Sequence, residues 1–160
     1  ERLDGSGYPS GLMGADIDRI SRMAAICDAY DTLATGTRSD DGMNPAIVIQ
    51  AMSSNPGWFD PGLMTAFTET MGSYPVGSIV KLRSQRLAMV VDQDPADHTR
   101  PKVRAFYSIA HKRMVSPEDI KLSDCYGEDE IAGIADPDAH GIADFPKLRE
   151  KLFNGAARSG

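Results

Sequence analysis

The chain has 160 residues, a formal net charge of −6 and a charged fraction of 25%. This length fits one domain or one part of a larger protein. The acidic balance argues against binding to a nucleic-acid polymer, which requires a basic surface. No stretch reaches the roughly 18 consecutive apolar residues of a membrane span, so we expect no membrane contact from this segment. Two distant cysteines, Cys27 and Cys125, predict no disulfide framework and favour a reducing, cytoplasmic environment.

The first fourteen residues are rich in glycine and include the run Asp4-Gly5-Ser6-Gly7-Tyr8-Pro9. Such a run excludes a helix or a central strand, because glycine permits positive φ and close backbone approach. Two interpretations are open on these residues alone. The run is either a solvent-exposed turn or a loop that holds the ring of Tyr8 in a fixed place.

A long helix is predicted over residues 16–35, with Asp16 or Asp18 at its first turn and Gly36 after its end. At about 100° per residue, Asp28 and Asp31 fall inside the apolar arc of this helix. We therefore expect both carboxylates to be buried, which is costly unless a metal, a cation or several donors meet them. The apolar members of the arc are Ile17, Ile20, Met23, Ala24, Cys27 and Ala34.

Two shorter helices follow, each opened by an N-cap residue and a proline, Asn44-Pro45 and Asp60-Pro61. We expect Trp58 and Phe59 to be core anchors before the second of them. Residues 78–82 and 86–91 predict a β-hairpin, and residues 101–109 a third strand.

The remainder predicts little regular structure. Residues 116–144 are expected to be mostly loop with one strand near 120–122, and residues 145–153 to form a short helix. Three histidines, His98, His111 and His140, match no metal-site spacing and are expected to be surface or hydrogen-bonded residues.

Several short motifs follow one another along the first half of the chain. They are Glu1-Arg2-Leu3-Asp4-Gly5-Ser6-Gly7-Tyr8-Pro9, Ala25-Ile26-Cys27-Asp28-Ala29-Tyr30-Asp31-Thr32-Leu33, Asn44-Pro45, Phe59-Asp60-Pro61 and Pro75-Val76-Gly77-Ser78. Together they resemble the HD-GYP family of the HD superfamily. The resemblance is specific through about residue 92 and weaker beyond it.

The resemblance implies a bacterial phosphodiesterase that hydrolyses cyclic di-GMP in second-messenger signalling. It implies a di- or tri-metal centre of iron or manganese, with attack by metal-activated water. Asp28 matches the family's metal-binding helix carboxylate, and Asp31 a neighbouring carboxylate with a supporting role. Tyr8 is expected near the nucleotide, within the motif loop formed by Asp4, Gly5, Gly7, Tyr8 and Pro9.

The resemblance also implies what this chain lacks. The family's His-Asp pair and remaining histidine ligands would precede Glu1, so we expect the carboxy-terminal half of the domain, inactive by itself and metal-loaded only when complete. Where the family commonly carries two basic phosphate-binding residues, an ungapped count reaches Thr37 and Asp40, with Arg38 one position away as a weak substitute. These departures keep an alternative open: a catalytically silent HD-GYP-like module that senses a nucleotide or binds a partner.

The predicted fold is mainly α: a partial HD-type helical bundle, a small β-hairpin or β-rich appendage and a short carboxy-terminal helix. The corresponding division is residues 1–75, 76–144 and 145–160. The expected partners are a cyclic dinucleotide and, as the resemblance permits, a diguanylate cyclase domain.

Overall fold

The computed structural model describes residues 5, 17–37 and 40–156, and the side chains of residues 37, 40, 41 and 156 lie outside the description. The chain divides into two compact units, residues Glu1–Ser73 and Tyr74–Gly160. We call them the helical unit and the sheet unit. The division predicted from sequence, with boundaries after residues 75 and 144, stays a prediction.

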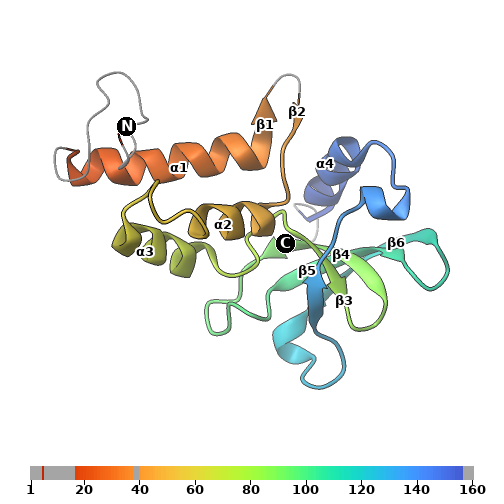
Figure 1. Ribbon diagram of the computed structural model, residues 1–160. Helices are drawn as coiled ribbons and strands as arrows, with labels where there is room; N and C mark the ends of the chain where they lie inside the picture. The colour runs from red at the N-terminus through yellow and green to blue at the C-terminus, as the bar shows by residue number, and fades with distance from the viewer. Residues whose placement is uncertain (1–4, 6–16, 38–39, 157–160) are drawn as a thin grey trace. The chain divides into compact units, whose positions relative to one another are not determined.

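The helical unit contains α1 (Arg19–Thr35), α2 (Pro45–Ser53) and α3 (Pro61–Met71), together with the short strands β1 (Gly36–Thr37) and β2 (Asp40–Asp41) (Figure 1). The predicted caps are confirmed: the side chains of Asp18, Asn44 and Asp60 each accept a backbone N–H in the first turn of the helix that they open. Gly36 ends α1 in the left-handed half of φ space, as its position predicts.

The core of the helical unit lies where α1 meets α2 and α3. The ring of Phe67 meets that of Tyr30 edge-on at 5.4 Å between centroids. Phe59 is buried as predicted, whereas Trp58 is 38% exposed, so the prediction of two core anchors is wrong for Trp58. The buried core residues are Ile26, Ala34, Val48, Met52, Phe59 and Met64.

The sheet unit is built on a five-stranded antiparallel sheet with the order β6-β5-β4-β3-β7. Its strands are β3 (Ile79–Leu82), β4 (Arg86–Asp92), β5 (Lys102–Ser108), β6 (Arg113–Lys121) and β7 (Ile131–Ile134). The helix α4 (Phe145–Ala156) follows the sheet, and two short 3-10 turns, η2 (Leu122–Asp124) and η3 (Asp138–His140), lie in its connections.

The strands β3, β4 and β5 are buried on both faces, and their successive side chains point alternately to the two sides of the sheet. Ile79, Leu87, Met89 and Phe106 face Leu152 of α4 in one core cluster. The alternate residues fill a second cluster on the other face: Val80, Leu82, Ala88, Val90, Val103, Ala105, Ile120 and Leu122.

A buried arginine joins α4 to the outer part of the sheet. The guanidinium of Arg104 on β5 donates to both carboxylate oxygens of Asp119 on β6, and its Nη1 donates to the carbonyl oxygen of Leu152 at 2.6 Å. Arg104 is 4% exposed. These hydrogen bonds hold the pKa of Asp119 below its usual value. The interaction therefore ties together three elements that are distant in sequence.

The prediction of a mainly α fold is wrong. The described residues combine a helical unit with a substantial five-stranded sheet. The hairpin and the third strand are confirmed. Residues 116–144 are mostly loop as predicted, but they hold more strand than the one expected near 120–122, because they contain most of β6 and all of β7. The pattern of β6 conceals a strand, because it is an exposed edge that contains Pro117 and charged residues and pairs across a register shift. β7 has only four residues and pairs with β3, far away in sequence. No helix among the described residues combines the length and the apolar character needed to span a bilayer.

Candidate functional site

The start of α1 is fixed by its N-cap residue, Asp18. Oδ1 of Asp18 accepts the backbone N–H of Ile20 at 2.9 Å and of Ser21 at 3.0 Å, while the Ser21 hydroxyl donates to its Oδ2 at 2.7 Å. These donors lower the pKa of Asp18, the Ser21 hydroxyl most of all. The cap orients the first turn of the helix that carries the predicted metal ligand.

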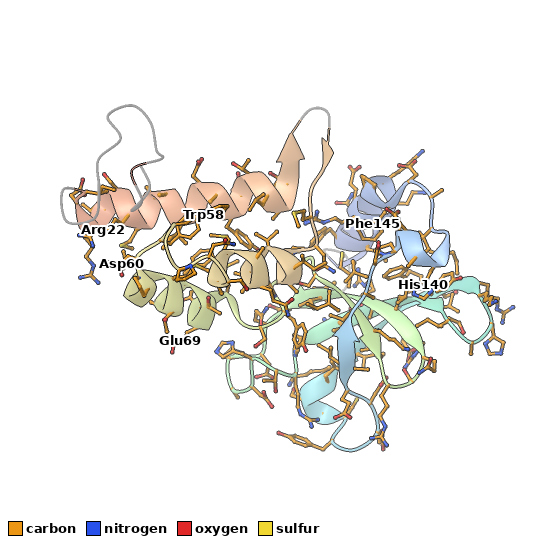
Figure 2. The ribbon with its side chains drawn as sticks, in the orientation of Figure 1. Arg22, Trp58, Asp60, Glu69, His140 and Phe145 are labelled. Atoms are coloured by element: carbon orange, nitrogen blue, oxygen red, sulfur yellow. The ribbon has the colours of Figure 1, made fainter. Side chains whose placement is uncertain are left out.

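Arg22 connects this helix to α3. Its Nη1 lies 2.8 Å from Oδ2 of Asp60, and its Nε donates to the carbonyl oxygen of Ile17 at 2.9 Å. Figure 2 labels Arg22 and Asp60 beside each other. The i,i+4 spacing predicts a pair between Arg22 and Asp18 instead. No local signal in the sequence indicates the observed partner, because Asp60 approaches Arg22 only where α3 packs against α1.

The predicted burial of the two carboxylates of α1 is wrong. Both Asp28 and Asp31 are exposed. The buried side of the helix is formed by Ile26 and Ala34, because this side packs on α2 and α3. Asp28 lies about 200° around the helix from Ile26, on the opposite side.

The exposed part of α1 nevertheless carries apolar residues. Ile20 is 80% exposed and Met23 is 49% exposed. Cys27 is also exposed, so its predicted burial is wrong. Ile17 and Ala34 are the members of the predicted arc that are buried. Most of the apolar residues of the predicted arc are therefore exposed instead of buried.

The described residues do not form a complete metal site. Among residues 5, 17–37 and 40–156, no group of three or more histidine, cysteine or acidic residues is arranged to hold a metal ion. Asp28 offers a single carboxylate, and a metal centre needs several ligands. His111 instead shares a hydrogen bond with the hydroxyl of Ser108, at 3.0 Å from Nδ1 to Oγ.

Other predicted site residues lie outside the described residues. These are Asp4, Gly7, Tyr8, Pro9 and Arg38. Gly5 of the motif loop is described and has φ of 79°, a value that favours glycine. The backbones of Thr37 and Asp40 are paired across β1 and β2, but nothing is described of their side chains.

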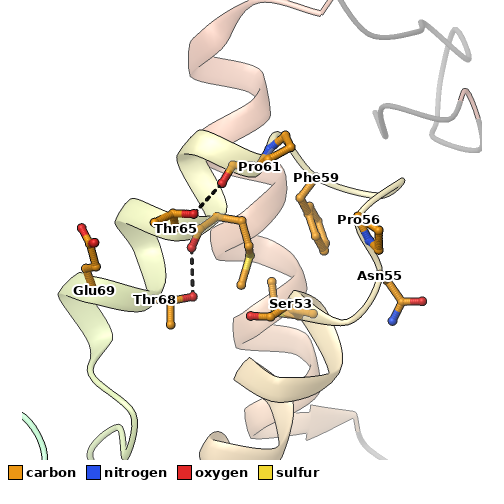
Figure 3. A pocket seen from close by; sticks show the side chains of 10 residues that line it. Ser53, Asn55, Pro56, Phe59, Pro61, Thr65, Thr68 and Glu69 are labelled. Carbon is orange, nitrogen blue, oxygen red and sulfur yellow. Dashed lines mark hydrogen bonds between the residues drawn. The ribbon is translucent and has the colours of Figure 1, made fainter.

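The helical unit has a cavity of about 340 Å³ at the α2–α3 connection (Figure 3). Phe59 and Pro56 line it, and its two threonine hydroxyls already donate to carbonyls of their own helix, Thr65 to Pro61 and Thr68 to Met64, both at 2.9 Å. Its one charged lining residue is Glu69, which would repel a phosphate. The chemistry of this cavity therefore does not suit a cyclic dinucleotide.

Comparison with known proteins identifies the class of the helical unit. Residues 1–63 match the HD domain family. The chain is 33% identical over 159 residues to the cyclic di-GMP phosphodiesterase PA4108 of Pseudomonas aeruginosa, covering 99% of this chain and 37% of that protein. It is 25% identical over 120 residues to the cyclic di-GMP phosphodiesterase PdeB of Borreliella burgdorferi, covering 74% of this chain and 31% of that protein.

A shorter and closer match covers 33 residues, at 64% identity, of the 3'3'-cGAMP-specific phosphodiesterase 1 of Vibrio cholerae; it covers 21% of this chain and 8% of that protein. No solved structure matches the chain. With its HD domain and these relatives, the chain belongs to the HD-GYP family, as the sequence landmarks predicted. It spans about a third of the length of the first two relatives.

Proposed function

We propose that this chain is part of a metal-dependent phosphodiesterase that hydrolyses a cyclic dinucleotide, with cyclic di-GMP as the substrate, in the bacterial cytoplasm. In this proposal Asp28 supplies one carboxylate ligand to an iron or manganese centre, and the other ligands come from outside the described residues. Asp31 supports Asp28, Tyr8 contacts the nucleotide from the motif loop, and Arg38 is a weaker phosphate contact. The 160 residues alone are inactive.

The observation that carries the proposal is the family membership, with a similarity to PA4108 that runs over nearly the whole chain. The exposure of Asp28 supports the assigned role. A carboxylate turned away from the core of its own unit is accessible to a metal ion and to ligands from other parts of a protein.

A second function is favoured by one observation. At the positions where basic residues would hold the substrate phosphates, this chain has Thr37 and Asp40. An acidic residue facing a phosphate is repulsive. The alternative is a catalytically silent module that senses a cyclic dinucleotide or binds a partner such as a diguanylate cyclase domain.

The test uses the full-length protein that contains these residues, purified with iron or with manganese. We expect it to hydrolyse cyclic di-GMP, and we expect Asp28→Asn to reduce both metal content and turnover by at least about tenfold, the range of a lost ligand or ligand support. Asp18→Asn is the matched control, because asparagine is also a good N-cap and leaves α1 intact. The 160-residue chain, assayed in parallel, should show no turnover.

Two results would decide against the enzyme. A metal-loaded full-length protein that cleaves no cyclic dinucleotide would refute the activity and leave the silent module. Equal metal content in Asp28→Asn and Asp18→Asn would refute the role of Asp28. An assay of 3'3'-cGAMP beside cyclic di-GMP tests the substrate, and faster hydrolysis of 3'3'-cGAMP would overturn the choice of cyclic di-GMP.

A further inference from the structure

The sheet unit has a cavity of about 500 Å³. It lies among three segments: the turn between β5 and β6, the loop after η3, and the first two turns of α4. Figure 2 labels His140 and Phe145, which mark the ends of that loop. Its volume is within the range of small-molecule sites. The residues that carry the argument are Lys112, Arg113, Asp144, Lys147, Leu148 and Lys151.

The lining of this cavity is strongly basic in an otherwise acidic chain. Four cationic side chains, Lys112, Arg113, Lys147 and Lys151, border it with the single carboxylate of Asp144. Lys147 and Lys151 lie one turn apart on the same side of α4. A cleft lined by charges of one sign concentrates its electrostatic potential and attracts the opposite charge. The arrangement favours an anionic ligand.

These four cations have no carboxylate partner within the part of the chain that is described. Other basic residues of the same unit do: Lys121 is 3.6 Å from Asp124, and Arg86 is 2.7 Å from Glu118. Four exposed cations around the single carboxylate of Asp144 leave the cavity with a net positive charge that attracts an anion. Ordinary surface ion pairing therefore does not explain this group.

The backbone around the cavity adds an independent observation. Lys112 has φ of 49° and Asp144 has φ of 54°, and they are two of the three described non-glycine residues in the left-handed region. Such conformations are unfavourable for residues other than glycine, and they cluster at ligand-binding sites, where the surroundings hold them. Here both border the same cavity. Asp144 also immediately precedes α4, whose first N–H groups favour an anion.

The remaining wall of the cavity is apolar and ordered. Ile142 and Tyr107 are buried, and the Tyr107 ring lies 5.9 Å from the His140 ring, centroid to centroid, while Leu148 packs against the core below. Met114 is exposed at the rim. A simple inorganic anion would use the cations and leave this surface unfilled. A ligand with both phosphate and ring parts would use the two together.

We propose that this cavity is a binding site for a phosphorylated small molecule of the nucleotide class. Lys112, Arg113, Lys147 and Lys151 hold the phosphate groups, and the wall formed by Ile142, Leu148 and Met114 contacts the nucleoside. The proposal concerns binding by the sheet unit and does not rest on the proposed hydrolysis.

The experiment measures binding to the 160-residue chain by isothermal titration calorimetry at low salt. The probes are GMP, cyclic di-GMP, pyrophosphate and guanosine. We expect saturable binding of GMP or cyclic di-GMP, weaker binding of pyrophosphate and none of guanosine. The Kd should rise at least about tenfold in the double variant Lys147→Ala, Lys151→Ala, and should also rise with ionic strength.

Lys121→Ala is the matched control, since it removes an exposed lysine of the same unit outside the cavity. Its Kd should equal that of the wild type. A second variant, Lys112→Gly, removes a cation and relieves the left-handed backbone, so it should bind more weakly while its Tm is equal or higher.

Three outcomes would overturn the proposal. The first is an absence of saturable binding of both nucleotides. The second is an unchanged Kd in the double variant and in Lys112→Gly, or an equal loss in Lys121→Ala, which would indicate nonspecific attraction. The third is pyrophosphate binding as tightly as the nucleotides, which would refute the contact with the nucleoside. Because the readout is binding, loss of the proposed hydrolytic activity would not affect it.

Discussion

The two units of this chain complete their cores to very different degrees. The sheet unit covers both faces of its sheet, and Phe106, Leu87 and Met89 are fully enclosed. The helical unit buries one side of α1 and leaves Ile20 and Met23 in contact with solvent. The sheet unit thus has the packing of a self-sufficient fold. The helical unit, which carries the candidate metal ligand, has an apolar surface still available for contact.

The largest expected effect is loss of a core ring in the sheet unit. Phe106→Ala removes a fully buried side chain and should lower the free energy of unfolding by about 3–5 kcal/mol. The matched change in the helical unit, Ile20→Ala, should alter it by less than about 0.5 kcal/mol, because that side chain is already exposed. Urea denaturation of the 160-residue chain measures both. A cost for Ile20→Ala comparable to that of Phe106→Ala would remove the contrast between the units.

An intermediate effect is expected where the helical unit is tightly packed. Gly42 passes so close to the end of α1 that an added Cβ would overlap the carbonyl of Ala34. Gly42→Ala should therefore destabilise the helical unit by about 1–3 kcal/mol, the usual cost of forced overpacking.

Gly57→Ala is the control for this change, because its added Cβ would meet no atom within 4 Å. It should be neutral within about 0.5 kcal/mol. Thermal unfolding followed by circular dichroism at 222 nm compares the two. Equal stability of both variants would mean that the backbone at the end of α1 shifts to accommodate the added Cβ, so this region is not tightly packed.

The smallest expected effect is on the stability of the sheet unit at low pH. Two hydrogen bonds from Arg104 hold the pKa of Asp119 below its usual value. A carboxylate with a lowered pKa in the folded state stabilises the fold above its unfolded-state pKa, and that contribution is lost as the pH falls through the lowered value. Below about pH 4 the wild type should therefore lose stability more steeply than Asp119→Asn. Parallel curves of stability against pH for the two proteins would contradict this assignment.

What could be predicted from the sequence was local. The caps Asn44-Pro45 and Asp60-Pro61 were found because an N-cap and its recipient N–H groups are neighbours in the chain. The side of α1 that is buried was not found, because apolar residues occur on both sides of the helix and the choice depends on where α2 and α3 pack. Local pattern could not decide it.

The same reasoning explains why the sequence did not predict β7, the full extent of β6 or the basic cavity of the sheet unit. β7 pairs with β3 across a sequence distance that no local pattern reveals, whereas β6 follows β5 directly and is concealed by its own Pro117 and charged residues. The cations Lys112 and Lys147 belong to different elements and become neighbours only in the fold. The sequence landmarks did identify the family, because they are short motifs whose order survives without knowledge of the fold.

The edge strand β6 also resists pairing with the sheet of another molecule. An edge strand presents unpaired backbone groups that can recruit the edge of another molecule. Here Pro117 removes one donor, the register shifts against β5 in this stretch, and charged side chains such as Glu118 and Lys121 occupy the strand. These are the features by which natural sheets resist edge-to-edge aggregation. The proline and the charged residues that conceal β6 in the sequence are thus the same features that oppose association between sheet edges at high concentration.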